Sequence, residues 1–291
     1  MDKCRQATAL SDIQRTEVDT PGKYSVVVLD VDGTMVGADF KVSVRLREAV
    51  QSAKKTGATV SLATGRMMRS ALTFAEVSGA AGPLICYQGA MTLLPGTQEV
   101  LRHERLDPGT ANSAVDLIRS SGATPVVYVE DEIYVEDATP WAEGYALRMD
   151  TELRLTPSLA EVANQHPTLV LGVDHSKGID KLVTTLSVDL DGRAMVTHSL
   201  AHFCEVGSAR AGKHMALDHL SKWLGVERER FVAFGDGAGD AAMLEWAGLG
   251  ICVEDGHPAA LMAADQVVPG PDKHGVAKSI EALLEQGKLG A

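Results

Sequence analysis

Cysteine, aromatic residues and positive charge are all scarce in this chain of 291 residues. The four cysteines are widely scattered and form no CxxC pair, a pattern that favours a reducing compartment over a disulfide framework. No stretch approaches the roughly 18 consecutive apolar residues of a membrane span, and the first twenty residues lack the apolar centre of a signal peptide. We therefore expect a cytoplasmic protein that does not enter a membrane.

The shortage of positive charge restricts the partners of the protein. Lys and Arg total 27 against 39 Asp and Glu, so the formal net charge is -12 at pH 7. An acidic surface repels both the phosphate backbone of nucleic acids and anionic lipid. We therefore expect neither nucleic acid nor a membrane as partner, and an anionic small molecule would need a local countercharge such as a bound cation or a helix N-terminus.

Short apolar runs alternate with helical patterns in both the first and the last third of the chain. Continuous apolar runs are typical of strands that are covered on both faces of a parallel sheet. The runs span residues 24–30, 58–63, 83–87, 231–235 and 249–253, and helical patterns span 44–57 and 213–225. This alternation predicts an α/β fold with a doubly wound, Rossmann-like parallel sheet as its core.

The middle of the chain follows a different order. A helix is expected at 106–122, a hairpin at 125–137, a helix at 141–149, a strand at 168–173, a helix at 177–186 and two strands within 193–207. This segment reads as a second α/β domain inserted between the two halves of the sheet. We expect a flexible N-terminal extension at 1–22, a core formed by 23–99 and 207–291, and an inserted domain at 100–206.

Four carboxylates follow two of the predicted strands. Asp30 and Asp32 come after the first strand, and Asp236 and Asp240 come after the fourth. The carboxyl ends of parallel strands meet at one edge of the sheet, where ligands bind. A lone Asp is usually a turn former or a helix cap, but Asp-x-Asp-Gly-Thr together with a second acidic pair is more specific. Because these carboxylates would repel one another, we predict that all four take part in a Mg²⁺ site.

Two further segments suit a phosphate. Thr64 and Gly65 follow the second strand at a helix start, where a hydroxyl and free N–H groups can bind phosphate oxygens. Lys213 opens a predicted helix, either as a solvated surface lysine or as an ammonium that clamps phosphate and an Asp. The turn at 234–240 departs from the G-x-G-x-x-G spacing of a dinucleotide site, and HExxH and GxSxG motifs are absent.

The segments VVVLDVDGTMVG, TGR with Thr64, Lys213 and GDGAGDAAML resemble the four motifs of the haloacid dehalogenase superfamily of phosphatases. The inserted domain resembles the cap of the Cof-type class IIB sugar-phosphatase branch. The resemblance implies that Asp30 is the nucleophile and Asp32 the general acid and base. It also implies that Thr64, Gly65 and Lys213 bind phosphate, and that Asp30, Asp236 and the backbone carbonyl of Asp32 hold Mg²⁺, with Asp240 supporting the site.

The chain departs from the pattern of this family at three positions. Gly239 stands where the family has Asn, His214 follows the lysine where the family has Gly, and Gln88 replaces another Asn. These departures point to an altered substrate, a lower turnover rate or lost catalysis. We expect the substrate to contact Arg66, Gln88, Tyr134 and Trp141; Tyr145 is a further aromatic residue of the inserted domain, although packing is the commoner role of such rings.

The sequence thus predicts a Mg²⁺-dependent phosphatase that acts on a small phosphorylated metabolite, a sugar phosphate above all. Two alternatives use the same residues. A phosphomutase or phosphotransferase would pass the phosphoryl group from the same aspartate to a second acceptor, and a non-catalytic sensor would only bind a phosphorylated ligand.

Overall fold

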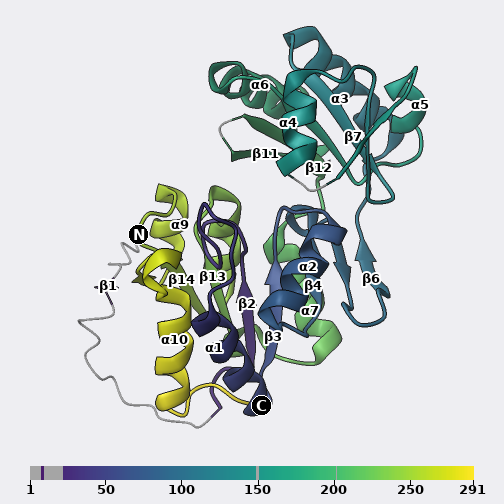
Figure 1. Ribbon diagram of the computed structural model, residues 1–291. Coiled ribbons are helices and arrows are strands. Elements are labelled where there is room, and N and C mark those ends of the chain that lie inside the picture. The colour runs from purple at the N-terminus through teal and green to yellow at the C-terminus, as the bar shows by residue number, and fades with distance from the viewer. Residues whose placement is uncertain (1–7, 10–21, 149–150, 201) are drawn as a thin grey trace.

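The computed structural model describes residues 8–9, 22–148, 151–200 and 202–291, which form two bodies joined by two chain crossings (Figure 1). Most of the predicted N-terminal extension lies outside these residues. Its described part includes the two-residue strand β1 (Thr8–Ala9), which pairs in parallel with β15 (Gln266–Val268). In the described part of the chain, no helix has the length and apolar character needed to cross a membrane.

The larger body is built on a nine-stranded sheet in the order β1-β15-β14-β13-β2-β3-β4-β5-β6. In this order, the strands are parallel from β1 through β15, β14, β13, β2 and β3 to β4. At the edge of the sheet, β5 is antiparallel to β4 and β6 is antiparallel to β5. The strands other than β1 and β15 are β2 (Val26–Leu29), β3 (Thr59–Ala63), β4 (Leu84–Cys86), β5 (Met91–Leu93), β6 (Val100–His103), β13 (Phe231–Gly235) and β14 (Leu249–Val253). All five predicted strands are therefore present.

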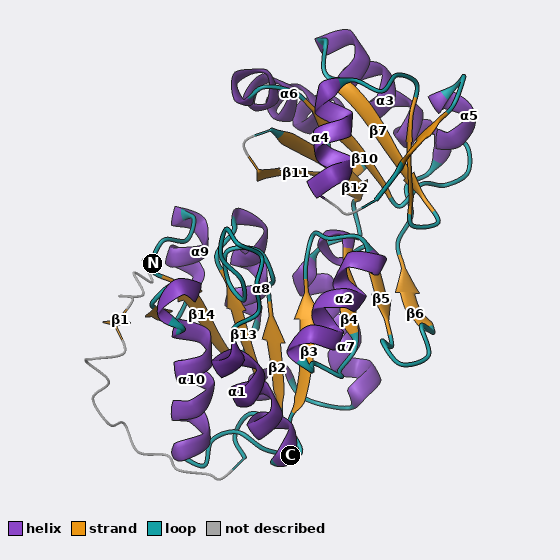
Figure 2. Cartoon of the chain, viewed as in Figure 1, coloured by secondary structure: helices purple, strands orange, loops and turns teal. Residues whose placement is uncertain are grey.

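Helices cover both faces of this sheet, as the continuous apolar strands predict (Figure 2). Alternate residues of β2 point to opposite faces: Val27 and Leu29 belong to one apolar cluster, and Val26 and Val28 belong to another. The first cluster includes α1 (Val44–Lys55), α2 (Met68–Ser78) and α10 (Gly275–Glu285), and the second includes α7 (Lys213–Leu224), α8 (Ala241–Trp246) and α9 (Pro258–Ala263). The doubly wound α/β fold is confirmed.

The smaller body has a six-stranded sheet in the order β11-β12-β10-β7-β8-β9, antiparallel except between β8 and β9. Its strands are β7 (Thr124–Val129), β8 (Glu132–Val135), β9 (Leu153–Leu155), β10 (Leu169–Val173), β11 (Ala194–Leu200) and β12 (Phe203–Ser208). Three helices, α3 (Pro108–Ser121), α5 (Leu159–Ala163) and α6 (Ser176–Asp189), pack on one face. Of the helices in the described residues, α4 (Pro140–Arg148) packs on the other face, through Ala142 and Tyr145.

Two strands cross the domain boundaries expected from the sequence. β6 begins at residue 100 but pairs with β5 in the larger sheet, and β12 continues in the smaller sheet to Ser208, beyond the expected boundary at 206/207. Local pattern does not tell which sheet a strand joins. We propose that residues 106–208 form the inserted domain, called the cap below, and that the remaining described residues form the core.

The cap lies over the carboxyl ends of β2, β3 and β13, with the face that carries α4 turned toward the core (Figure 1). Apolar contact joins the two bodies: the ring of Tyr87 in the core meets the ring of Tyr128 in the cap edge-on, with centroids 5.9 Å apart. At the chain crossings, Arg102 donates hydrogen bonds to the carbonyl oxygens of Gly89 (2.6 Å) and Arg210 (2.5 Å). This arrangement encloses the strand ends between the two bodies.

Candidate active site

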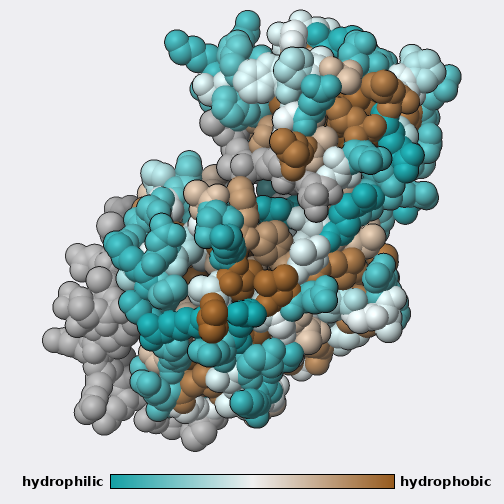
Figure 3. All heavy atoms as spheres, viewed as in Figure 1, coloured by the Kyte–Doolittle hydropathy of each residue, from teal (hydrophilic) through white to brown (hydrophobic). Residues whose placement is uncertain are grey.

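A pocket lies between the core and the cap, above the ends of the central strands, and the space-filling view shows the surface hollowed between the two bodies (Figure 3). Nine of the eleven residues that the sequence predicts for the site line this pocket. They are Asp30, Asp32, Thr64, Gly65, Arg66, Gln88, Lys213, Asp236 and Asp240. Residues more than 200 positions apart in the chain are thus gathered because β2, β3 and β13 are parallel neighbours.

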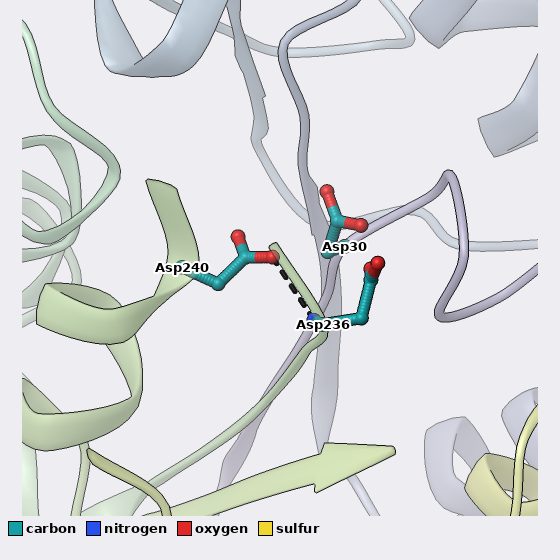
Figure 4. A group of neighbouring side chains, drawn as sticks. All are labelled: Asp30, Asp236 and Asp240. Atoms are coloured by element: carbon teal, nitrogen blue, oxygen red, sulfur yellow. Dashed lines mark hydrogen bonds between the residues drawn. The ribbon is translucent and has the colours of Figure 1, made fainter. Parts of the chain in front are cut away.

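Three carboxylates form the centre of the pocket (Figure 4). β2 and β13 are paired with Leu29 opposite Phe234, so Asp30 and Asp236 leave adjacent strand ends, and Asp240 follows one turn later. One carboxylate oxygen from each residue lies within 4.8 Å of the other two. Burial, together with the neighbouring Asp240, raises the pKa of Asp30 well above its usual value, and burial raises the pKa of Asp236 to about 6. Such crowding of oxygen donors fits a hard divalent cation.

Lys213 is the buried counterion of this group. Its Nζ lies 2.6 Å from Oδ1 of Asp30 and 2.6 Å from Oδ1 of Asp240, and its side chain is 4% exposed. Burial lowers the pKa of Lys213, but the carboxylates of Asp240 and Asp30 outweigh that effect, so the pKa lies above the ordinary value. A solvated surface lysine, the alternative left open by the sequence, is therefore excluded.

Asp240 organises the loop rather than standing free in the pocket. Its Oδ2 accepts hydrogen bonds from the backbone N–H groups of Asp236 (3.1 Å) and Gly237 (2.9 Å), while Oδ1 binds Lys213. Both oxygens are thus engaged, which leaves Asp30 and Asp236 better placed than Asp240 to bind a cation directly.

Gly33 allows the first acidic loop to approach the second. Its φ is +81°, and a Cβ there would lie 2.3 Å from Oδ2 of Asp236, a distance that no side chain tolerates. The next residue, Thr34, donates a hydrogen bond of 2.7 Å to Oδ1 of Asp236. The Asp-Gly-Thr sequence therefore positions the carboxylate of a loop 200 residues away.

Asp32 lies outside the three-carboxylate group and has its own cation. Arg66 donates from Nε to Oδ2 and from Nη2 to Oδ1 of Asp32, both at 2.7 Å, and from Nη1 to Ser70. The guanidinium also lies over the ring of Phe74, 4.6 Å from its centroid. The sequence predicts Arg66 as a substrate contact. In the structure the Nε and Nη2 groups of its guanidinium donate to Asp32, so we propose that Arg66 positions that carboxylate.

The departures at Gln88 and Gly239 are related in space. A Cβ on Gly65 would lie 2.4 Å from Nε2 of Gln88, and a Cβ on Gly239 would lie 3.3 Å from its Oε1. The Gln88 amide therefore spans the space between the two glycines at the edge of the pocket. A side chain at position 239 would require the Gln88 amide to move by a few tenths of an ångström.

Two predicted aromatic contacts are not among the residues that line the pocket. Tyr134 packs against the apolar cluster on the helix-covered face of the cap sheet, and Trp141 is exposed and stacks on His202. Five cap residues line the pocket instead, namely Tyr145, Thr197, His198, Phe203 and Glu205. The alternation in β12, with Phe203 and Glu205 separated by the buried Cys204, is a signal that could have identified the inward-facing pair.

A carboxylate of the inserted domain binds the N-terminus of a core helix. Asp131, in the turn between β7 and β8, accepts hydrogen bonds from the backbone N–H groups of Met68 (2.9 Å) and Arg69 (3.2 Å) at the start of α2. It further accepts from Nε of Arg69 (2.9 Å) and from the hydroxyl of Tyr87. The N-cap residue of α2, Met67, makes no capping hydrogen bond with its own side chain, so the contact from Asp131 couples the placement of the cap to α2.

Asp131→Ala should lower the free energy of unfolding by about 1–3 kcal/mol, because it leaves the α2 N-terminus and the Tyr87 hydroxyl without this acceptor. Urea denaturation followed by circular dichroism measures the effect. Glu130→Ala is the matched control: Glu130 is exposed and shares the left-handed backbone of the same turn, so its loss should change the stability by no more than about 0.5 kcal/mol. Equal stability of the two variants would contradict the capping role.

Comparison with known proteins agrees with this architecture. Residues 27–280 match the family model described as haloacid dehalogenase-like hydrolase. The chain is 24% identical over 270 residues to the "Putative phosphatase YxeH" of Bacillus subtilis, a match that covers 90% of this chain and 98% of that protein.

Two solved structures show the same fold. A haloacid dehalogenase-like hydrolase from Bacteroides thetaiotaomicron is 24% identical with a TM-score of 0.81, over 89% of this chain and 99% of that one. A structure titled as a HAD subclass IIB sugar phosphatase is 19% identical with a TM-score of 0.77, over 89% of this chain and 98% of that one.

The fold defines the class of protein first: a Rossmann-like α/β protein with an inserted second domain. The chain belongs to the haloacid dehalogenase-like hydrolase family. The predicted superfamily, fold class and class of enzyme, a phosphatase of that superfamily, are confirmed.

Proposed function

We propose that this enzyme hydrolyses phosphate monoesters of small metabolites, sugar phosphates above all, through an aspartyl-phosphate intermediate and with Mg²⁺. The observation that carries the proposal is the group formed by Asp30, Asp236, Asp240 and Lys213, enclosed beneath the cap at the end of β2. Phosphoryl transfer depends chiefly on positioning and charge neutralisation, and this group supplies both.

Asp30 is the proposed nucleophile. One of its carboxylate oxygens attacks phosphorus while the bond to the leaving alcohol breaks, and Asp32 donates a proton to that oxygen. Asp32, now ionised, takes a proton from water, which attacks the aspartyl phosphate and releases inorganic phosphate and free Asp30. Both oxygens of Asp32 accept hydrogen bonds of 2.7 Å from Arg66, so we propose that the guanidinium releases one of them while Asp32 carries the proton and binds it again once Asp32 is ionised.

The remaining residues neutralise and hold the phosphoryl group. Lys213, with Thr64 and the N–H of Gly65 at the end of β3, is placed to bind its non-bridging oxygens. Asp30, Asp236 and the backbone carbonyl of Asp32 would hold Mg²⁺, with Asp240 keeping Lys213 and the loop in place. When bound, the cation supplies positive charge that offsets both the crowded carboxylates and the phosphate.

The position of the cap supports the proposal that the substrate is small. It covers the pocket and so limits access of water and of bulky esters to the carboxylates. The fold similarity to a solved sugar phosphatase supports sugar phosphates as the first class to examine. The scattered cysteines and the acidic composition support a cytoplasmic location.

The test is release of inorganic phosphate from an aryl phosphate and from a panel of phosphorylated metabolites, with Mg²⁺ and with a chelator. We expect turnover of at least about 1 s⁻¹ on the best substrate. Because the ammonium of Lys213 balances only part of the charge of Asp30, Asp236 and Asp240, chelation should reduce the rate at least about 100-fold and added Mg²⁺ should restore it. A rate insensitive to the chelator would contradict the metal requirement.

Product analysis separates the alternatives. A phosphatase releases inorganic phosphate in proportion to the alcohol formed, whereas a mutase or phosphotransferase yields an isomeric or new phosphate ester without equivalent phosphate release. A protein that binds these esters without turning any of them over would be a sensor.

A further inference from the structure

Among the described cap residues that line the pocket, Glu205 is the one carboxylate. Successive side chains of β12 alternate between the two faces of the cap sheet. Cys204 and Val206 point into the helix-covered face, so Phe203 and Glu205 point to the opposite face. Both line the pocket together with Asp30 and Asp236 of the core. Glu205 is 5% exposed, so its charge lies within the enclosed space and not at its solvent-exposed rim.

The neighbours of Glu205 form a surface suited to an organic leaving group. Thr197 stands opposite Glu205 in the pairing of β11 with β12, and His198 follows it at the pocket wall. The rings of Tyr145 and Phe203 meet edge-on with centroids 4.8 Å apart. The cap thus presents a carboxylate, a hydroxyl and two aromatic rings to whatever is attached to the phosphate, whereas the imidazole of His198 lies 3.7 Å from Asp180 of α6.

The charges around the pocket disfavour a second anion. Five carboxylates line it, and among the described lining residues the arginine and lysine side chains are those of Arg66 and Lys213. Arg66 is paired with Asp32, and Lys213 is shared between Asp30 and Asp240. A carboxylate on the leaving group would approach Glu205, whereas a hydroxyl or ammonium group would donate a hydrogen bond to it.

We propose that Glu205 is a specificity-determining residue that selects phosphate esters whose alcohol carries hydroxyl or amino donors and rejects esters that carry a carboxylate. This inference rests on the proposed function, because it names the substrate class of the same site. The core binds the phosphate, and Glu205 of the cap contacts the other end of the substrate.

The experiment compares matched pairs of substrates. Straight-chain polyol phosphates of three to six carbons are each paired with the aldonic acid phosphate of the same length, which replaces the terminal hydroxymethyl group by a carboxylate. The ratio of kcat/KM for polyol over acid is measured for the wild type and for Glu205→Gln. Glu161→Gln, an exposed acid on α5 of the cap, is the control. Asp30→Asn and an aryl phosphate test the underlying chemistry separately.

At one chain length we expect the wild type to prefer the polyol phosphate by at least about tenfold, because like charges repel strongly in a partly buried site. Glu205→Gln should reduce this ratio at least about tenfold, chiefly by raising kcat/KM for the acid, and Glu161→Gln should leave the ratio unchanged. Three outcomes would overturn the inference while the proposed function stands. They are an unchanged ratio in Glu205→Gln, a preference of the wild type for the acid phosphates, and hydrolysis of the aryl phosphate without hydrolysis of either series. Turnover of the aryl phosphate by Asp30→Asn would overturn the proposed function instead.

Discussion

Asp30→Asn is expected to reduce phosphate release by roughly 10⁴-fold or more, the scale of loss seen when an enzyme loses its nucleophile. The amide has the same shape as the carboxylate, but it cannot form the acyl phosphate. It also removes one of the two acids that Lys213 contacts at 2.6 Å. A coupled assay for inorganic phosphate with the aryl phosphate, under saturating Mg²⁺, measures the change.

Asp39→Asn is the matched control for this experiment. Asp39 is an exposed acid in the same loop region, and its carboxylate accepts a hydrogen bond from the backbone N–H of Lys41. Its substitution should change the rate by less than about twofold, as is usual for surface positions. If Asp30→Asn keeps more than about one per cent of the wild-type rate with its fold intact, another residue is the nucleophile and the proposed mechanism is wrong.

Lys213→Met should produce the second large effect, and it should appear in stability as well as in rate. Lys213 is buried with Asp30 and Asp240, and methionine retains most of its apolar stem without the ammonium. Removing one partner of a buried ion pair leaves uncompensated charge and costs about 3–5 kcal/mol. We expect a loss of unfolding free energy of that size in urea denaturation without divalent cation, and a drop of at least about 100-fold in turnover.

Magnesium should recover part of the stability that Lys213→Met loses, since a bound cation neutralises the same carboxylates in the folded state. Lys222→Met is the control on the same helix: Lys222 is 75% exposed and pairs with Asp218 at the surface, where an ion pair contributes at most about 1 kcal/mol. Equal destabilisation by the two substitutions would contradict the central position that we assign to Lys213.

The predictions from sequence succeeded where a local pattern has a direct structural meaning. Continuous apolar runs predicted the five strands, because only strands covered on both faces are apolar at every position. The carboxyl ends of parallel strands share one edge, so Asp30, Thr64 and Asp236 were expected to meet, and they line one pocket. The assignment of their catalytic and metal-binding roles remains a prediction.

Local pattern could not predict the contacts that depend on how two distant segments are placed. Arg66 follows a strand end as a phosphate-binding residue would, but its partner is Asp32, 34 positions earlier. Tyr134 and Trp141 are aromatic and belong to the cap, yet the register of β8 and the exposed side of α4 turn them away from the pocket. In these cases the residue type indicated a possible site residue, but the sequence did not indicate where the side chain points.

The sequence by itself determined the five central strands, the doubly wound sheet and the acidic strand ends, because each follows from periodicity or from the few residues beside a strand. The tertiary structure alone decided which sheet β6 joins, that Asp131 of the cap caps α2 of the core, and that Glu205 faces the carboxylates. These contacts join the core to residues of a separately folded sheet, and their geometry depends on the placement of one body on the other, which no local pattern encodes.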